Sequence, residues 1–584
     1  MRFTTIEPRG TSRDMTEAFY GYNHKLKIRR GEFYNTENLT SAYFPMLANR
    51  GKRSVYKKLR APGGIIEKDA LAYVDNGALF YNDTVTPVTG LADGEKQLVS
   101  MGAYICIFPD KVYYNTADPS DFGGMEADYS SLGSVTYKLC KVDGSEYETE
   151  PTMSDEEPTE PVNNQLWIDT SSGMTLMQYS SNAGMWSEVT SVYTKIQFTS
   201  QGKVSRLFST YDGVEISGSQ FEDANGSHIL YLVGGEVEKT QDFIVVVGLL
   251  PMAFEQTEGS VRIQRKLPQL DFVCECQNRL WGCFYGNDGE KNLNEIYCSA
   301  LGDFKNWSQF LGLSTDSWRG SVGSDGVWTG AVNYLGYPTF FKENIIHRVS
   351  VSAVGAHSIA ETPCRGVQKG SHKSLQVVNE TLYYKSRSDV CAWQGGFPES
   401  ASAALGDERY YDAVAGTHGD KYYISMRDAK NMWHLFCFDI AKGIWFREDN
   451  LQALQFAKVD DELFCINAQS GDLIGLNGVA GTQEETVTWM AESGMQYYEY
   501  PDKKYLSRYN LRLKMEAGAE LRIYLQYDSM GDFELAGTVK LNGTNTVTVP
   551  IKPRRCDHLR MRLEGSGEFR LFSIAKILEI GSDK

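Results

Sequence analysis

Short runs of alternating apolar and polar residues, separated by turn residues, extend along most of the chain. One stretch shows the pattern well, and it predicts strands at Lys421–Met426, Trp433–Phe438, Ile444–Phe446, Gln455–Ala457 and Leu463–Ile466. Four or five short antiparallel strands within about 55 residues are typical of one blade of a β-propeller.

Similar units recur at irregular spacing. Ala70–Tyr81 predicts a hairpin with Asn76-Gly77 at its turn, and further units are expected at 97–114, 272–307, 330–351 and 375–393. We therefore predict an all-β fold built on an irregular propeller of about six to eight blades. A pair of β-sandwiches would give similar local patterns and stays open as an alternative. Helix is expected at most over Asp14–Phe19.

Two regions interrupt this pattern. Residues 145–161 contain seven acidic residues, no basic residue and three prolines, which is typical of a linker. Three short strand patterns follow it, so we predict a small β module over 137–195, inserted at a loop tip. Longer alternating runs after 485 predict a C-terminal β-sandwich or jelly roll. The predicted domains are an N-terminal arm (1–60), the propeller (61–136 and 196–484), the inserted module (137–195) and the C-terminal sandwich (485–584).

Composition supports a folded, intracellularly assembled protein. The chain has 584 residues, of which 42% are hydrophobic and 23% charged, so it is globular and has several domains. Most of its 11 cysteines lie inside apolar runs, which predicts buried, reduced thiols and assembly in a cytosol. The first residues contain no apolar segment typical of a secretory signal, and no apolar run reaches the length of a membrane span.

Charge is distributed unevenly. The net charge is −17, but residues 1–60 contain 13 Lys or Arg against five acidic residues, so this segment is +8 and the rest is −25. A basic arm on an acidic body can bind an acidic partner, including a neighbouring subunit. Alternatively, this segment contacts the phosphates of a nucleic acid, or it is a basic face that contacts only solvent. The candidate docking residues are Arg29, Arg30, Arg50, Lys52, Arg53, Lys57 and Lys58.

Motifs for catalysis are weak. Cys274, Cys276, Cys283 and Cys298 lack the Cys-x₂-Cys spacing of zinc sites, and no nucleophile elbow or phosphate-binding loop occurs. We predict no catalytic residue, metal or cofactor. Glycoside cleavage stays open, because 75 acidic residues cannot be sorted into pairs by sequence. Trp167, Tyr179 and Trp186 are candidates for stacking on sugar rings, although we favour a packing role in the small module.

Three segments carry a family resemblance. These segments resemble sequence motifs of bacteriophage tail proteins. They are Arg30-Gly-Glu-Phe-Tyr-Asn-Thr-Glu-Asn38 followed by Pro45–Arg53, Asn278–Gly282 followed by Glu295–Trp307, and Gly366–Ser371 followed by Leu382–Gly396. The likeness is to the tail nozzle (tail tubular protein B) of short-tailed phages. It covers about a quarter of the chain, and the inserted module and the C-terminal β domain depart from the family's pattern.

The resemblance implies a structural virion protein. It implies a homo-oligomeric ring, a hexamer in that family, around the channel through which double-stranded DNA leaves the tail, with adjacent tail or adaptor proteins and fibres as partners. Nozzle, neck, baseplate and tail tip remain open as positions in the virion. A receptor-binding or glycan-cleaving tail protein that contacts a host cell-surface glycan is the alternative, as is a cellular propeller scaffold.

Overall fold

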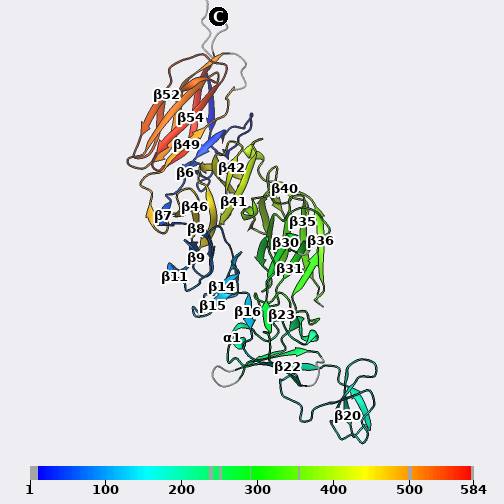
Figure 1. Ribbon diagram of the computed structural model, residues 1–584. Coiled ribbons are helices and arrows are strands. Elements are labelled where there is room, and N and C mark those ends of the chain that lie inside the picture. Colours follow the sequence, from blue (N-terminus) through cyan, green and yellow to red (C-terminus); the bar gives the residue numbers. More distant parts are fainter. Residues whose placement is uncertain are drawn as a thin grey trace, which may run out of the picture. The chain divides into compact units, whose positions relative to one another are not determined.

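The computed structural model describes residues 11–235, 241–248, 253–289, 291–352, 355–497 and 503–580. Strands make up 53% of the chain and helices 2%, which confirms the predicted all-β class (Figure 1). The longest helical turn among the described residues is α1 (Val204–Leu207), and no described helix is long and apolar enough to cross a membrane. The chain forms two compact units: unit 1 is Met1–Leu98, Gly326–Arg348 and Ala360–Lys584, and unit 2 is Val99–Asp325 and Val349–Ile359.

Unit 1 contains small antiparallel sheets in which successive strands are neighbours. The first sheet consists of β8 (Pro62–Glu67), β9 (Leu71–Asp75), β10 (Ala78–Tyr81) and β11 (Thr84–Val85), and the second of β33 (Gly330–Tyr334), β34 (Tyr337–Lys342), β35 (Ile345–Val351) and β36 (His357–Pro363). The third consists of β37 (Gln376–Val378), β38 (Thr381–Lys385), β39 (Val390–Trp393) and β40 (Glu399–Ser400), and the fourth of β41 (Tyr410–His418), β42 (Lys421–Asp428), β43 (Trp433–Asp439) and β44 (Ile444–Asp449). The fifth includes β45 (Ala453–Val459), β46 (Glu462–Asn467) and β47 (Asp472–Gly475). The turn between β9 and β10 has positive φ at Asn76 and Gly77, as the Asn-Gly pair predicts.

The sheet of β45, β46 and β47 is completed by a strand from the other end of the chain. β7 (Ser54–Lys58) pairs antiparallel with β47, and β48 (Thr482–Gln483) pairs with the free edge of β7. More than 400 residues separate β7 from β47 in sequence. A strand added to an open edge satisfies backbone groups that would otherwise stay unpaired.

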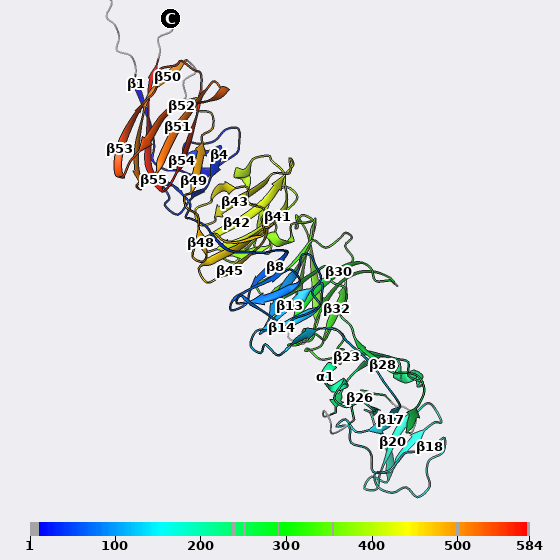
Figure 2. The same cartoon turned by 60° about the vertical axis from the view of Figure 1, so that its left-hand side comes forward.

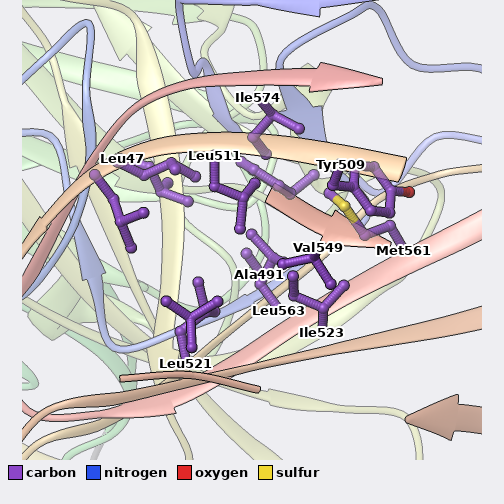
Figure 3. Close-up of a cluster of buried hydrophobic side chains, with 14 of the residues drawn as sticks. Leu47, Ala491, Tyr509, Leu511, Leu521, Ile523, Val549, Met561, Leu563 and Ile574 are labelled. Carbon is purple, nitrogen blue, oxygen red and sulfur yellow. The ribbon is translucent and has the colours of Figure 1, made fainter. Parts of the chain in front are cut away.

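The C-terminal part of unit 1 consists of two sheets around one hydrophobic core. One sheet contains β5 (Leu39–Thr40), β6 (Leu47–Asn49), β55 (Phe569–Ile580), β50 (Lys504–Met515), β53 (Gly543–Pro550) and β1 (Thr11–Thr16). The other contains β4 (Asn35–Glu37), β49 (Thr488–Glu492), β54 (Leu559–Ser566), β51 (Glu520–Tyr527) and β52 (Met530–Lys540). Buried positions alternate with more accessible ones along β50, β51 and β54, and Figure 3 shows Leu511, Ile523 and Leu563 pointing into the same core.

The N-terminal segment is part of these sheets, which corrects the prediction of a separate arm over 1–60. β1 pairs with β55, β4 with β49 and β6 with β55, and Leu47 of β6 is fully buried in the core (Figure 3). The helix expected at Asp14–Phe19 is replaced by the end of β1, because the edge of β55 offers this segment a row of hydrogen-bond partners. Residues 1–10 of the predicted arm lie outside the described residues.

Unit 2 contains two sheets of the same meander type. Their strands are β12 (Gln97–Met101), β13 (Tyr104–Phe108), β14 (Val112–Asn115) and β15 (Phe122–Gly124); and β29 (Phe272–Glu275), β30 (Leu280–Asn287), β31 (Asn292–Cys298) and β32 (Trp318–Ser321).

Three further sheets lie between them in sequence. One has the order β16 (Ala127–Ser130), β28 (Arg262–Arg265), β23 (Gly213–Ser217), β24 (Gly226–Ile229). The second has the order β25 (Leu232–Gly234), β26 (Phe243–Val247), β22 (Tyr193–Phe198), β17 (Val135–Cys140), β27 (Phe254–Gln256). The third is β18 (Thr152–Ser154), β19 (Leu166–Asp169), β20 (Thr175–Ser180) and β21 (Met185–Glu188), and the label β20 marks it in Figure 1.

The small sheet of β18–β21 is inserted between two paired strands. β17 and β22 pair antiparallel from Val135↔Phe198 to Cys140↔Tyr193, so the chain leaves and returns at adjacent positions. The predicted boundary at 195 has to move, because it cuts β22, which pairs along its length with β17 and with β26. Residues 196–265 share sheets with residues 127–140 and not with the meander sheets, since β28 pairs with β16 and β27 with β17.

Candidate assembly surface

A basic loop with an apolar tip lies between β2 (Gly21–Tyr22) and β3 (Glu32–Phe33) of unit 1. Leu26 is 88% exposed, the highest value among the large exposed apolar side chains of the described residues. It is flanked by Lys25 and Lys27, which are exposed and form no ion pair with any described residue. We call residues 23–32 the basic loop.

One carboxylate closes the basic loop. Oε2 of Glu32 accepts hydrogen bonds from Nδ2 of Asn23 and from the backbone N–H of Arg29, both at 2.8 Å. Gly31 is required at φ 85°, since a Cβ there would lie 2.1 Å from the carbonyl oxygen of Ala18. The loop is therefore held in one conformation by the residues at its ends.

His24 anchors the same loop to the neighbouring sheets. Its backbone N–H donates to the carbonyl of Ala404 at 2.8 Å, and its ring lies 2.9 Å from the carbonyl oxygen of Tyr34 and stacks on the Tyr34 ring. A preorganised loop loses little conformational entropy on binding, which favours a role in docking.

Arg29 and Arg30 lie on the basic loop, as two of the predicted docking residues. The Arg29 guanidinium covers the ring of Tyr20 at 4.0 Å and donates to Oε1 of Glu32 at 2.8 Å. Arg30 pairs with Asp14 of β1. Both side chains remain more than half exposed, so they add positive charge to the loop while also bracing it.

Arg50 and Arg53 have partners inside this chain. Arg53 is buried and donates to the carboxylates of Glu448 at 2.6 Å and Asp449 at 2.5 Å, at the end of β44. Arg50 is also buried and forms a two-pronged bond with Glu484, at 2.8 and 3.1 Å. These contacts bind the segment before β7 to β44 and to the chain after β48, so both arginines hold the chain together.

The remaining predicted docking lysines are dispersed. Lys52 and Lys58 are exposed, whereas Nζ of Lys57 donates to the hydroxyl of Tyr73 at 2.5 Å and lies 3.5 Å from Asp83. The seven predicted residues therefore do not form one continuous patch. The prediction did not include Lys25, Leu26 and Lys27. The sequence feature that could have identified them is an apolar residue between two lysines, in a segment bounded by Gly21 and Gly31.

Acid is expected to weaken the arginine contacts. Burial by itself would raise the pKa of Asp449, but the Arg53 guanidinium and the backbone N–H of Leu451 hold it below its ordinary value of about 3.9. Hydrogen bonding and charge from Arg50 likewise outweigh burial and lower the pKa of Glu484. A carboxyl with a lowered folded pKa stabilises the fold above its unfolded pKa and loses that contribution as the pH falls through the folded pKa.

We therefore expect the contribution of these two carboxylates to the free energy of unfolding to be constant near pH 7 and to decrease below about pH 4. Urea unfolding at pH 7, 5, 4 and 3 would measure this for the parent chain and for Asp449→Asn with Glu484→Gln. At pH 7 the double variant should have a lower free energy of unfolding than the parent chain. Between pH 5 and pH 3 its free energy of unfolding should decrease less. Parallel curves for the two proteins would contradict the assignment.

The aromatic residues of the small sheet pack against one another. Trp167 and Trp186 are 7% and 9% exposed, and their rings meet edge to face at 5.4 Å. Nε1 of Trp167 donates to the backbone and side-chain oxygens of Ser154. Both tryptophans are buried by the sheet's own packing, whereas Tyr179 is half-buried and packs on Trp186.

No cluster of metal-ligating side chains occurs among the described residues. All 11 cysteines are free, and burial raises the pKa of Cys274 and Cys276 well above the ordinary value, so these thiols stay protonated.

Comparison with known proteins identifies no family. No protein-family model and no curated protein matches the chain. Solved structures with some likeness include an exo-β-1,3-galactanase from Phanerochaete chrysosporium, at 9% identity and TM-score 0.22 over 52% of this chain and 94% of that one. A second is a glycoside hydrolase family 43 arabinoxylan arabinofuranohydrolase from Bacillus subtilis, at 10% identity and TM-score 0.19 over 52% of this chain and 94% of that one. A third is the extracellular domain of a putative hybrid two component system from B. thetaiotaomicron, at 9% identity and TM-score 0.24 over 93% of this chain and 98% of that one. Likenesses of this size carry no argument about the fold or activity of this chain.

Proposed function

We propose that this protein is a structural component of a bacteriophage tail that assembles into a ring and docks an acidic neighbouring protein through the basic loop. The observation that carries the docking role is the exposed Leu26 between Lys25 and Lys27, on a loop that Glu32 and His24 hold rigid. The resemblance of three sequence segments to those of tail nozzle proteins supports the setting in a virion.

We also propose that the meander sheets are blades of a β-propeller. Among the described residues, five such sheets belong mainly to unit 1 and two to unit 2, and their meander topology supports this proposal. Completion of the last sheet by β7 is how a propeller joins its two chain ends, and it supports this reading. The two-sheet C-terminal part then corresponds to the predicted sandwich.

The partner of the basic loop is an acidic surface with a small apolar depression. Two lysines and two arginines supply long-range attraction, and burial of the leucine supplies a short-range contribution. Another copy of this chain is one acidic candidate for this partner, because residues outside 1–60 have a net charge of −25. The ring, its adaptor or fibre partners, passage of DNA and assembly in the host cytoplasm belong to the same proposal.

The test is incorporation into particles. The variant Lys25→Glu with Leu26→Ser and Lys27→Glu should fold normally, since these side chains have no partners among the described residues, but should be lost from purified virions at least tenfold. Quantitative immunoblotting of particles against cell lysate measures this. Lys458→Glu with Lys552→Glu, which makes the same change of charge at two exposed positions elsewhere in unit 1, serves as the control for a general charge effect. Normal incorporation of the loop variant would overturn the docking role.

Native mass separates this proposal from the receptor-binding or glycan-cleaving alternative. Mass photometry with negative-stain images should find a ring of several 65.5 kDa chains with a central hole. A monomer that cleaves a cell-surface glycan would favour the alternative.

A further inference from the structure

A cavity in unit 2 lies between the sheet of β16, β28, β23 and β24 and the loop before β32. It has a volume of about 660 Å³, within the usual size of ligand pockets. Its lining combines polar side chains with two aromatic rings, Tyr231 and Phe310. Figure 2 shows β23 and β28, which form the floor, side by side. We call this cavity the unit 2 groove.

The floor of the groove is a row of polar residues that crosses three strands. Glu215 of β23 is directly opposite Ser227 of β24 and directly opposite Gln264 of β28. Residues opposite each other on adjacent strands point to the same face of a sheet, so a carboxylate, a hydroxyl and an amide lie side by side. Nε2 of Gln264 donates to Asp128, while Glu215 lies 3.1 Å from Nζ of Lys266.

The opposite wall carries an exposed aromatic ring. Phe310 is 52% exposed, and the Arg319 guanidinium lies 5.9 Å from its centroid. Arg319 lines the groove, is exposed, and forms no ion pair with any described residue, so its guanidinium is available to a ligand. Tyr231 adds a second ring, held edge to face by Tyr193 at 5.2 Å.

The loop that presents Phe310 is fixed from both ends. Oδ2 of Asp316 accepts from the backbone N–H groups of Leu311 at 2.5 Å and Leu313 at 3.0 Å, and Oδ1 accepts from Nε2 of Gln309. At the other end, the backbone of Ser308 comes so close to Gly213 that a Cβ there would lie 2.2 Å from its carbonyl oxygen. The ring and the polar floor are therefore held in place without a ligand, as a built binding site requires.

This combination matches the chemistry of a sugar ring. A pyranose has an apolar face of C–H groups, which packs on an aromatic ring, and an edge of hydroxyl groups that needs several donors and acceptors close together. An apolar peptide side chain would cover Glu215, Ser227 and Gln264 without offering a hydrogen bond to the polar atoms that they still present to water, which is costly. We propose that the unit 2 groove binds a glycan, with a sugar ring on Phe310 and its hydroxyl edge on Glu215, Ser227 and Gln264.

The experiment is binding of the full chain to a printed array of hexose, N-acetylhexosamine and uronic-acid oligosaccharides, followed by calorimetric titration of each sugar that binds. We expect at least one of them to bind, and Phe310→Ala and Glu215→Ala each to weaken that binding at least tenfold. Leu313→Ala is the matched control, because Leu313 is on the same loop, is 58% exposed and does not line the groove. It should leave affinity unchanged.

Two variants on different elements guard against a folding artefact, and thermal melting of each checks that the chain remains folded. Absence of binding to every sugar on the array would overturn the proposal. Binding that the groove variants leave unchanged would also overturn it, by placing the sugar elsewhere on the chain. Neither result depends on ring formation or on the basic loop, so the proposed tail function is tested separately.

Discussion

Replacing Arg53 by methionine is expected to lower the free energy of unfolding of unit 1 by about 3–5 kcal/mol. The side chain is buried between Glu448, which is also buried, and Asp449. The two carboxylates hold the pKa of Arg53 above its ordinary value against the opposing effect of burial. Removing the guanidinium leaves two carboxylates without their counter-charge, and the cost of that exceeds the modest net gain of the original pair.

Urea unfolding followed by tryptophan fluorescence would measure this, since Trp445 lies in the same strand as Glu448. Lys52→Met, one residue away and exposed, should change the free energy of unfolding by less than about 0.5 kcal/mol. Combining Arg53→Met with Glu448→Leu should recover part of the loss, because a buried ion pair replaced on both sides by apolar groups is often tolerated. Equal effects of Arg53→Met and Lys52→Met would show that the buried contacts contribute nothing.

Leu47→Ala should destabilise the C-terminal sheets by about 2–5 kcal/mol, the usual cost of emptying a buried leucine site. Leu47 belongs to the N-terminal segment but is 0% exposed in the core shared by β50, β51, β54 and β55 (Figure 3). If residues 1–60 were a separate arm, the same change would have almost no effect. The substitution therefore measures how far the N-terminal segment is part of the fold.

Leu26→Ala is the matched comparison, because it makes the same change in the same segment at a fully accessible position. We expect it to alter stability by less than about 0.5 kcal/mol. Hydrogen exchange of the amides of β55, compared between the two variants, would locate the effect, since β6 pairs with β55 at Leu47↔Leu571. Loss of protection there only in Leu47→Ala is the expected result.

Local elements of this protein followed from its sequence. The predicted strands Lys421–Met426 and Trp433–Phe438 correspond to β42 (Lys421–Asp428) and β43 (Trp433–Asp439), and the Asn76-Gly77 turn has the predicted backbone. Alternation of apolar and polar residues acts over a few neighbouring positions, and turn residues act through their own φ and ψ preferences. Both signals are local and can therefore be detected in a single sequence.

The candidate sites were visible only in part. Arg29 and Arg30 were predicted from charge and lie on the basic loop, but the same reasoning gave equal weight to Arg50 and Arg53, which are buried. Charge composition cannot distinguish an exposed arginine from one with two carboxylate partners some 395 residues away. The unit 2 groove was not predicted, because its floor joins β23, β24 and β28 and its wall comes from a loop about 50 residues further along.

The sequence by itself thus determined the strands, their turns and the all-β class, because these depend on side-chain periodicity and local backbone preference. Tertiary structure alone decided that β1 pairs with β55, β4 with β49 and β7 with β47. Backbone hydrogen bonds at a sheet edge are the same for any residue, so a strand's sequence does not name its distant partner. That choice depends on which apolar faces are buried together when the whole chain is folded, and it also decides which basic residues remain free to bind another molecule.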